Sequence, residues 1–507
     1  MFSSDFNPLL SVLQKYTDDK GSVAWDALIN EVKSMTLLFA GNKAEMPHAG
    51  TAMEEMMKSM AKAQGEEISW KAAVSDSPIK KAFEAKKFAH AAGDAKIVPP
   101  PFVPLACDLL LNTERTARSA VYINVPFCQT RCAFCMFYIA PYRPEESKRY
   151  ADALIKEMQM WHGSKAVGQK PIHAVYMGGG TPTALEAYDL KRIITYCREN
   201  LPLANDCEVT VEGRLSYFDE KKIEACLKAG ANRFSLGVQT FDTKIRQSVG
   251  RISSQEELIK GLENLAAYDE ASVVIDLIFG LPGQTLASWR NDLNIVSSLP
   301  IHGVDLYQLI LLEGSPLEKL IAAGKYEHAP DSQERADMYR IGCEAMTSSH
   351  WKQLTASHFA RTTRERNIYN VLAKSDADTL AFGPGAGGKI QGLAFMNSRK
   401  YEDYLKKVES GIKPISMMFV PGENWRLYKE LGEELELGYV DFDYLKKKYA
   451  FDISVLAKEV FMQWQEAGLL VLSGRFADLT LAWKFWAVTM TQLLTNYLQR
   501  KLKGNCK

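Results

Sequence analysis

Three closely spaced cysteines constrain this chain more than any other feature. They stand at Cys128, Cys132 and Cys135, in a C-x3-C-x2-C spacing. Thiolates this close together can hold three irons of a cubic [4Fe–4S] cluster, which is normally bound by four cysteines. Because no fourth cysteine lies nearby, one iron would stay open for a substrate or cosubstrate. Zinc is the main rival metal, but a structural zinc site needs four closed ligands, usually in two paired arms, and no second arm follows.

The segment before the cysteines predicts a strand that ends at the cysteine loop. Residues 119–125 form an apolar, β-branched run, and Pro126 ends it. From there the chain alternates between strand-like and helical segments. Strands are expected at 119–125, 171–177, 207–213, 232–238, 271–278 and 303–310, with helices near 144–163, 184–200, 219–229, 253–267 and 285–298. This alternation predicts parallel βαβ units with right-handed crossovers, and such barrels carry their chemistry at the carboxyl ends of the strands.

Glycines and polar residues stand where these predicted strands end. Gly178, Gly179 and Gly180 follow the second strand, and adjacent glycines let the backbone approach a ligand closely. Thr181 comes next and can cap the following helix. Polar side chains also stand near the ends of the third and fifth strands, at Glu212 and Asp276, and after the fourth strand, at Gln239 and Arg251. In a barrel of parallel strands these residues would meet at one mouth.

In these motifs the sequence resembles the radical S-adenosylmethionine (SAM) superfamily, first through Cys128, Cys132 and Cys135. More narrowly, it resembles the branch that contains the oxygen-independent coproporphyrinogen dehydrogenase, although Asn124 stands where that branch has a histidine. The resemblance implies an α/β fold built on a partial (β/α)6 barrel. It also implies that SAM binds the open iron, and that an electron from the reduced cluster cleaves the S–C5′ bond of SAM.

The resemblance assigns SAM-binding roles to the residues at the barrel mouth. Gly178, Gly179, Gly180 and Thr181 would cradle the methionyl amino group, which Glu212 would also hold. Arg251 would bind the carboxylate, because a guanidinium matches that group in charge and shape. Gln239 and Asp276 would bind the ribose hydroxyls. Phe134 would line the adenine side, and Tyr122 would reach the cluster or its SAM. Tyr122 and Glu212 are the two residues predicted to be catalytic.

The chain is predicted to have five parts. They are a helical extension at 1–76, an approach segment at 77–118, the barrel at 119–350, a region at 351–414 that completes and links the barrel, and a C-terminal domain at 415–507. The last part is expected to be mostly helical with a short β pair, and it resembles the winged-helix-like lid that closes the tetrapyrrole pocket in this branch. The glycine run at 382–388 resembles a segment packed near the cluster. His90 is a candidate axial haem ligand, but a solvent-facing histidine at a helix end is favoured.

Charge and composition exclude some classes of partner. The 507 residues carry 61 Lys plus Arg and 61 Asp plus Glu, so the formal net charge of zero gives no support for a nucleic-acid or membrane-surface partner. The N-terminus lacks the layout of a signal peptide, and no window of about eighteen uninterrupted apolar residues occurs. We therefore expect a cytoplasmic protein without a nucleic-acid or membrane partner. An exposed iron–sulfur cluster would suit anaerobic conditions.

Among functions, the sequence favours a radical SAM methyltransferase that opens the haem porphyrin ring anaerobically, gives a linear tetrapyrrole and releases iron for acquisition. The basic segment before His90, the Glu212–Arg214 version of the third strand end, and the residues after Cys135 resemble that group. The resemblance implies haem or a related tetrapyrrole as substrate and a flavodoxin- or ferredoxin-type electron donor. A methyl transfer fed by SAM would also need a second SAM molecule.

Two alternatives stay open. One is an oxygen-independent coproporphyrinogen III dehydrogenase, but the arginine- and tyrosine-rich arm of that enzyme has no counterpart before Tyr122. The other is a haem chaperone of the same fold. Such chaperones typically begin close to the first strand, whereas more than a hundred residues precede it here. The fold alone cannot separate these functions.

Overall fold

The computed structural model describes residues 69–84, 86, 95–311, 316–326 and 329–504. The chain divides into two compact units, residues 1–68 and 69–507. Only the second unit contains described residues. The predicted extension at 1–76 thus lies almost entirely outside the described residues, and His90 lies outside them as well.

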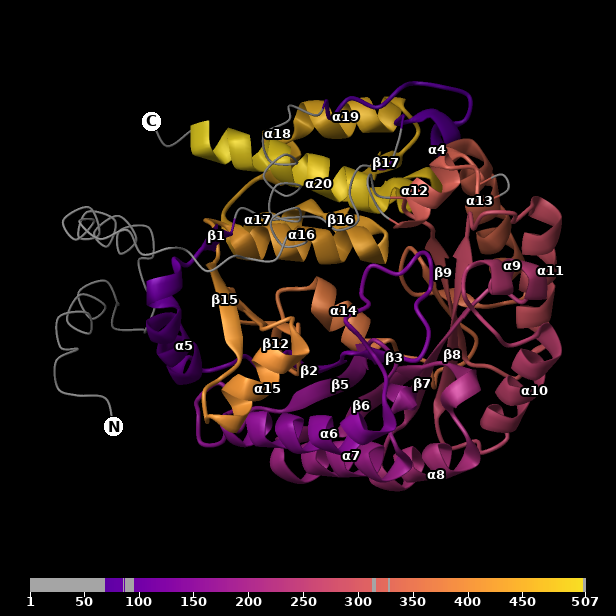
Figure 1. The fold of residues 1–507 in the computed structure, drawn as a ribbon. Coiled ribbons are helices and arrows are strands. Elements are labelled where there is room, and N and C mark those ends of the chain that lie inside the picture. The colour runs from indigo at the N-terminus through magenta and orange to yellow at the C-terminus, as the bar shows by residue number, and fades with distance from the viewer. Residues whose placement is uncertain (1–68, 85, 87–94, 312–315, 327–328, 505–507) are drawn as a thin grey trace. The chain divides into compact units, whose positions relative to one another are not determined.

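Six parallel strands form the centre of the second unit. They are hydrogen-bonded in the order β2 (Ser119–Val125), β5 (Ile172–Gly179), β6 (Leu203–Gly213), β7 (Arg233–Gln239), β8 (Ser272–Phe279) and β9 (Gly303–Gln308). The crossover helices are α6 (Pro144–Gln159), α7 (Ala187–Asn200), α8 (Glu220–Ala229), α10 (Gln255–Ala266) and α11 (Leu286–Ser298), which run along the outer side of the strands (Figure 1). The α/β prediction with six barrel strands is confirmed.

Local sequence explains where the crossover helices begin. Asp219 caps α8 by accepting from the backbone N–H of Lys222, and capping boxes start α10 at Ser254 and α11 at Thr285. A cap satisfies backbone donors that have no partner within the helix. The helix α8 ends at Gly230, which has a φ of +99° that favours glycine. These boundaries return the chain to the next strand and leave the strand ends clear at the mouth.

The described residues extend the barrel sheet to thirteen strands. A further parallel strand, β12 (Asp378–Phe382), pairs with β2, and the sequence analysis did not predict it. Antiparallel strands continue on both sides: β13 (Gly387–Ile390), β14 (Leu393–Asn397), β15 (Ile415–Val420) and β1 (Lys96–Ile97) beyond β12, and β11 (His358–Ala360) and β10 (Lys352–Gln353) beyond β9. The first strand of the barrel is therefore an interior strand of the sheet.

The C-terminal region is mostly helical, with a small sheet of its own. Its helices are α16 (Trp425–Leu437), α17 (Phe442–Tyr449), α18 (Ile453–Leu456), α19 (Lys458–Glu466) and α20 (Leu481–Gly504), and its strands are β16 (Tyr439–Asp441), β17 (Leu470–Ser473) and β18 (Phe476–Leu479). The expected β pair is β17 with β18, and β16 adds a third strand. Among the described residues, no helix has the length and apolar character needed to cross a membrane.

The segment before the barrel packs on these C-terminal helices. Trp464 Nε1 donates to the carbonyl oxygen of Trp70 at 2.8 Å, and Trp486 Nε1 donates to that of Ile79 at 3.0 Å. The Gln463 side chain pairs with both the N–H and the carbonyl of Ala72, at 3.0 and 2.7 Å. The first described residues and the end of the chain thus share one core.

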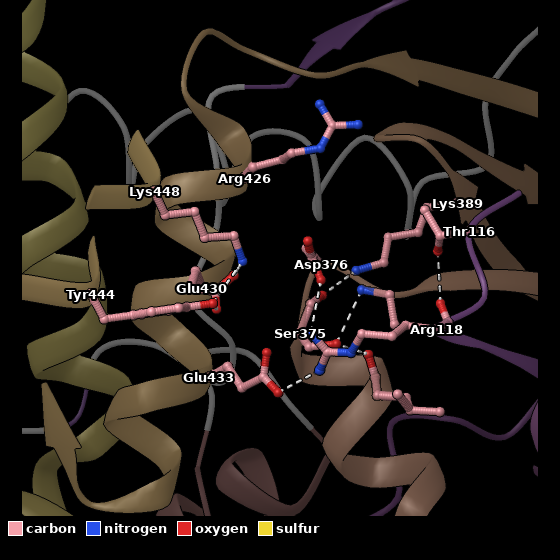
Figure 2. A network of polar contacts seen from close by, with 12 residues as sticks. Thr116, Arg118, Ser375, Asp376, Lys389, Arg426, Glu430, Glu433, Tyr444 and Lys448 are labelled. Atoms are coloured by element: carbon pink, nitrogen blue, oxygen red, sulfur yellow. Dashed lines mark hydrogen bonds and ion pairs between the residues drawn. The ribbon is translucent and has the colours of Figure 1, made fainter. Parts of the chain in front are cut away.

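Ion pairs join the barrel to the C-terminal region (Figure 2). Arg118, just before β2, contacts Glu433 of α16 at 2.6 Å and Asp376 at 3.3 Å. Lys448 of α17 contacts Glu430 of α16 at 2.6 Å. Pairs that are partly exposed contribute little stability one by one, because water screens them. The Arg118–Glu433 pair joins α16 to the β2 side, whereas the Lys448–Glu430 pair lies within the C-terminal region.

Candidate functional site

The cysteine loop starts where β2 ends and is closed at its base. The short strand β3 (Phe127–Cys128) pairs with β4 (Ala140–Pro141), and the Tyr142 N–H donates to the Cys128 carbonyl at 3.0 Å. The Thr181 N–H, from the end of β5, donates to the Phe127 carbonyl at 2.7 Å. The loop is therefore anchored to the mouth of the barrel, as the sequence predicts.

The three cysteines gather within this loop. Cys128 and Cys132 are buried, and Cys135 is half-buried. Burial raises the pKa of the Cys128 thiol, and the nearby Cys135 and Cys132 raise that pKa further. Among the described residues, no three His, Cys, Asp or Glu side chains converge as ligands of one metal ion would.

Hydrogen-bond donors reach two of the three sulfurs. The Thr181 hydroxyl donates to Cys128 Sγ at 3.4 Å, and Arg214 Nη2 donates to Cys132 Sγ at 3.2 Å. Arg251 also hydrogen-bonds Cys132. Donors of this kind stabilise thiolates, which are the form that binds metal. The Arg214 contact was missed in the sequence, where this residue was noted only as part of a strand-end motif.

The glycine motif is packed too tightly for any other residue. A Cβ at Gly178 would overlap the Glu212 carboxylate, and one at Gly180 would overlap the Phe127 carbonyl oxygen. Gly179 has a φ of +101°, and a Cβ there would overlap the Asn124 side chain. These positions form a close-packed backbone cradle between the cysteine loop and β6, which only glycine permits.

Two carboxyl groups on alternate barrel strands, Glu212 of β6 and Asp276 of β8, have raised pKa values. Burial raises the pKa of Glu212 to about 7, although the Gly179 N–H and the Tyr176 hydroxyl hydrogen-bond to it. Burial, and then the charges of Asp305 and Glu212, raise the pKa of Asp276 to about 8. A cation at the barrel mouth would keep both groups ionised.

Gln239 and Arg251 each carry a buried polar atom that has no hydrogen-bond partner among the described residues. Gln239 stands at a bulge that ends β7, with a φ of +73°, and its Oε1 is buried without a partner among the described residues. Arg251 is 8% exposed, and its Nη1 donates to the Gly237 carbonyl at 2.7 Å. Its Nε likewise has no partner within the described part of the chain. Its guanidinium lies 5.9 Å from the centre of the Phe134 ring.

A stack of three tyrosines lies beside the carboxyl groups. The Tyr369 ring, from α14 (Ile368–Lys374), stacks on Tyr176 at 4.4 Å and on Tyr122 at 6.0 Å between centroids. Burial, and then the charge of Glu212, raise the pKa of Tyr122 and of Tyr176 far above the usual value. Sequence analysis named Tyr122 but gave no role to the other two. Tyr176 could have been found, because it precedes the glycine motif by two residues and so shares a strand face with Gly178.

Asn124 connects the cysteine-loop strand to the glycine run at 382–388. Its Nδ2 donates to the Pro384 carbonyl at 2.5 Å, and its Oδ1 accepts from the Tyr122 hydroxyl at 2.9 Å. Gly383 approaches the Asn124 backbone so closely that a Cβ would overlap it. The residue that replaces the histidine of the related branch thus orients Tyr122 within this protein.

A buried ion network lies in the interior next to these residues. Arg233 Nη2 contacts Glu365 Oε1 at 3.1 Å, and His358 bridges Glu365 and Asp305 at 3.0 and 2.8 Å. Burial alone would lower the pKa of His358, but the two carboxylates raise it to about 9. The network balances its own charges. At the mouth, burial and the neighbouring carboxylates raise the pKa of Asp276, and they outweigh the charges of Arg233 and His358, which lie close enough to lower it.

The structure brings the sequence-predicted residues together at one end of the barrel. They come from β2, the cysteine loop, the strands β5 to β8 and the loop before α10: Tyr122, Phe134, Gly178, Gly179, Gly180, Thr181, Glu212, Gln239, Asp276 and Arg251 with the three cysteines. The unpartnered Gln239 and Arg251 atoms, the glycine cradle and the two carboxyl groups fit SAM, which carries an ammonium, a carboxylate and ribose hydroxyls. The role of each residue stays a prediction.

Several known proteins are similar to this chain. Residues 122–296 match the radical SAM superfamily model. Anaerobilin synthase of Escherichia coli O157:H7 is 42% identical over 395 residues, which cover 77% of this chain and 87% of that protein. The haem chaperone HemW of Bacillus subtilis is 28% identical over 358 residues, 69% of this chain and 92% of that one.

The solved structure of coproporphyrinogen III oxidase (HemN) from Escherichia coli, a radical SAM enzyme, has the same fold. Its TM-score is 0.70 at 20% sequence identity, over 84% of this chain and 99% of that one. The domain match, the 42% identity and this shared fold lead to one conclusion. The chain belongs to the radical SAM superfamily, in the HemN-like branch that includes anaerobilin synthase.

Proposed function

We propose that this chain is a radical SAM methyltransferase that opens the haem porphyrin ring without oxygen, yields a linear tetrapyrrole and releases the iron. One observation carries the proposal: 42% identity to anaerobilin synthase across 77% of the chain. The matched region is 395 residues long, whereas the HemW proteins of Bacillus subtilis and Synechocystis are 28% and 29% identical and the HemN structure is 20% identical.

The residues of the mouth would divide the work of binding. Cys128, Cys132 and Cys135 would hold a [4Fe–4S] cluster with one open iron. When bound, the cluster and SAM supply an electron-driven cleavage of the S–C5′ bond that yields a carbon-centred radical. Glu212 would accept the SAM ammonium, and Arg251 would form charge-assisted hydrogen bonds to the SAM carboxylate.

Two tyrosine side chains on barrel strands support a flat substrate. Tyr307 of β9 is 41% exposed although it lies on a barrel strand, and Tyr122 is only half-buried. Aromatic faces bind planar rings through offset stacking. We propose that haem or a related tetrapyrrole enters on this side, and that residues 415–507 close over it as a lid.

The proposal also includes the electron donor, the source of the methyl group and the cellular location. The electron would come from a flavodoxin- or ferredoxin-type protein, and a second SAM would provide the methyl group. The protein would act in an oxygen-free cytoplasm and contribute to iron acquisition. We propose that residues 77–118 are an approach segment, that residues 119–350 form the barrel, and that residues 351–414 complete and link it.

The proposal is tested by anaerobic incubation with haem, SAM and a low-potential reductant. The expected result is loss of the haem absorption together with iron that a chelator can capture. Coproporphyrinogen under the same conditions should be left intact. Decarboxylation of coproporphyrinogen with haem untouched would favour the dehydrogenase, and tight haem binding without any product would favour the chaperone.

A further inference from the structure

Arg214 reaches from the end of β6 to a cysteine sulfur. Its Nη2 donates to Cys132 Sγ at 3.2 Å, while Nη1 donates to the Thr130 hydroxyl at 2.7 Å. The backbone of Arg214 is also fixed, because its N–H donates to the Thr183 hydroxyl at 3.0 Å. Both ends of Arg214 are therefore fixed. Its guanidinium bonds to the cysteine loop, and its backbone bonds to the loop after β5.

Thr181 supplies the second donor, to a different cysteine. It is fully buried, and its hydroxyl lies 3.4 Å from Cys128 Sγ. Its backbone N–H donates to the Phe127 carbonyl at 2.7 Å, which fixes it against the cysteine loop. Two of the three thiols thus face a side-chain donor that a barrel strand end holds in place.

The charge around Cys132 is strongly positive. Arg214, Arg246 and Arg251 line one cleft beside the loop. Arg246 and Arg251 are buried, and burial and then their mutual repulsion lower the pKa of Arg246 to about 10. Guanidinium groups that repel one another in this way suit an anionic neighbour, and three thiolates with the cluster they hold provide one.

We propose that Arg214 and Thr181 set the reduction potential of the cluster by hydrogen-bonding two of its cysteine sulfurs. The inference rests on the proposed cluster at the three cysteines. Reduction adds one electron from a low-potential one-electron donor and makes or breaks no bond. Because the added negative charge spreads onto the sulfurs, donors to them stabilise the reduced state more than the oxidised one, and hydrogen bonds to sulfur are known to tune such potentials. These are positioning residues, since each acts through a cysteine.

The test is a redox titration of the reconstituted full chain, followed by electron paramagnetic resonance in the absence of SAM. Arg214→Gln and Thr181→Val should retain full iron and sulfide, and both should have lower midpoint potentials. We expect Arg214→Gln to make reduction about tenfold less favourable, which is about 59 mV for a one-electron couple. Arg214→Lys should shift the potential less, because it keeps the charge but loses the planar fork.

Arg131→Gln is the matched control. Arg131 lies in the same loop and is exposed, and its guanidinium stands 5.3 Å from the Tyr138 ring centre rather than at a sulfur. Its loss should leave the potential unchanged. An equal shift in this control would overturn the proposal, because general charge would then explain the effect. Unchanged potentials in fully loaded Arg214→Gln and Thr181→Val would overturn it as well.

A different result would address the cluster itself. If the unsubstituted chain takes up no cluster, the assignment of the three cysteines fails, and with it this inference. If Arg214→Gln alone takes up no cluster, the midpoint potentials of Arg214→Lys and Thr181→Val test the proposal instead. A lower potential in both supports the proposal, and unchanged potentials in both contradict it.

Discussion

Asn124 donates from its Nδ2 to the carbonyl oxygen of Pro384 at 2.5 Å, across 260 residues of sequence. This contact joins the strand before the cysteine loop to the glycine run beyond β12. The same side chain accepts from the Tyr122 hydroxyl. The Asn124 side chain thus positions both the Tyr122 ring and the glycine run at 382–388.

Replacing Asn124 should cost stability. In Asn124→Ala the buried Pro384 carbonyl loses its donor, and leaving a buried group unsatisfied costs about 1–3 kcal/mol of unfolding free energy. Denaturant unfolding measures the change. Asn200→Ala is the control, because Asn200 is exposed on α7 and bonds only within its helix, so its effect should stay within about 0.5 kcal/mol. Equal losses in the two variants would contradict this account.

The three cysteines should be needed together for the cluster. Anaerobic reconstitution of the unsubstituted chain should give about four irons and four sulfides per chain. Replacement of Cys128, Cys132 and Cys135 by Ala should abolish both. Replacement of Cys197, Cys207 and Cys226, which are buried elsewhere, is the matched control and should leave the content unchanged. Full cluster content in the first variant would refute the assignment.

Arg251→Ala should weaken SAM binding and spare the cluster. The variant removes a charge-assisted clamp on the SAM carboxylate, which we expect to cost about 2–3 kcal/mol of binding free energy. Equilibrium binding of SAM to the reconstituted protein measures it. Arg364→Ala removes an exposed arginine that pairs with Asp269, and it should bind SAM normally. Unchanged SAM affinity in Arg251→Ala would remove Arg251 from the site.

Glu212 should make the unliganded protein less stable as pH rises. Burial raises the pKa of Glu212 from 4.5 to about 7. Between these values the folded chain holds a proton that the unfolded chain has released, so stability falls as pH rises from about 4.5 to about 7. Glu212→Gln cannot ionise and should gain up to about 3 kcal/mol over the unsubstituted chain by pH 8.

Unfolding curves at pH 5 and pH 8 test this dependence, and SAM binding gives a second measurement. Glu212→Gln should bind SAM poorly, because a neutral amide replaces the carboxylate that would hold the ammonium. Glu224→Gln, at an exposed position paired with Lys228, should bind SAM like the unsubstituted chain and show no added gain at pH 8. A Glu212→Gln variant that is both unchanged in stability and able to bind SAM would contradict the assigned role.

Sequence alone predicted the barrel well, because its strands are apolar runs that alternate with capped helices. The expected strand at 232–238 is β7, Arg233–Gln239, and that at 303–310 is β9, Gly303–Gln308. The short strand β12 was missed because it is five residues long and runs directly into glycines. Its place beside β2 depends on a contact between segments more than 250 residues apart, and periodicity cannot show such a contact.

The sequence motifs predict most of the site, but they do not identify the residues that only packing brings to it. The places of Glu212 and Asp276 follow from the predicted strands, and their expected SAM-binding roles come from the family resemblance. Tyr369 reaches the site from a helix far along the chain, and Arg214 acts through a side chain whose direction no pattern specifies. Packing brings both to the mouth, so only the folded chain shows them.

The most direct test of the proposed activity follows the methyl group. Haem is incubated anaerobically with the reconstituted protein, a low-potential reductant and SAM that carries a labelled methyl group. The account predicts label in a linear tetrapyrrole, 5′-deoxyadenosine as a second product, and neither in the triple cysteine variant. Haem recovered intact and unlabelled, from protein shown to hold its cluster and to cleave SAM, would contradict it.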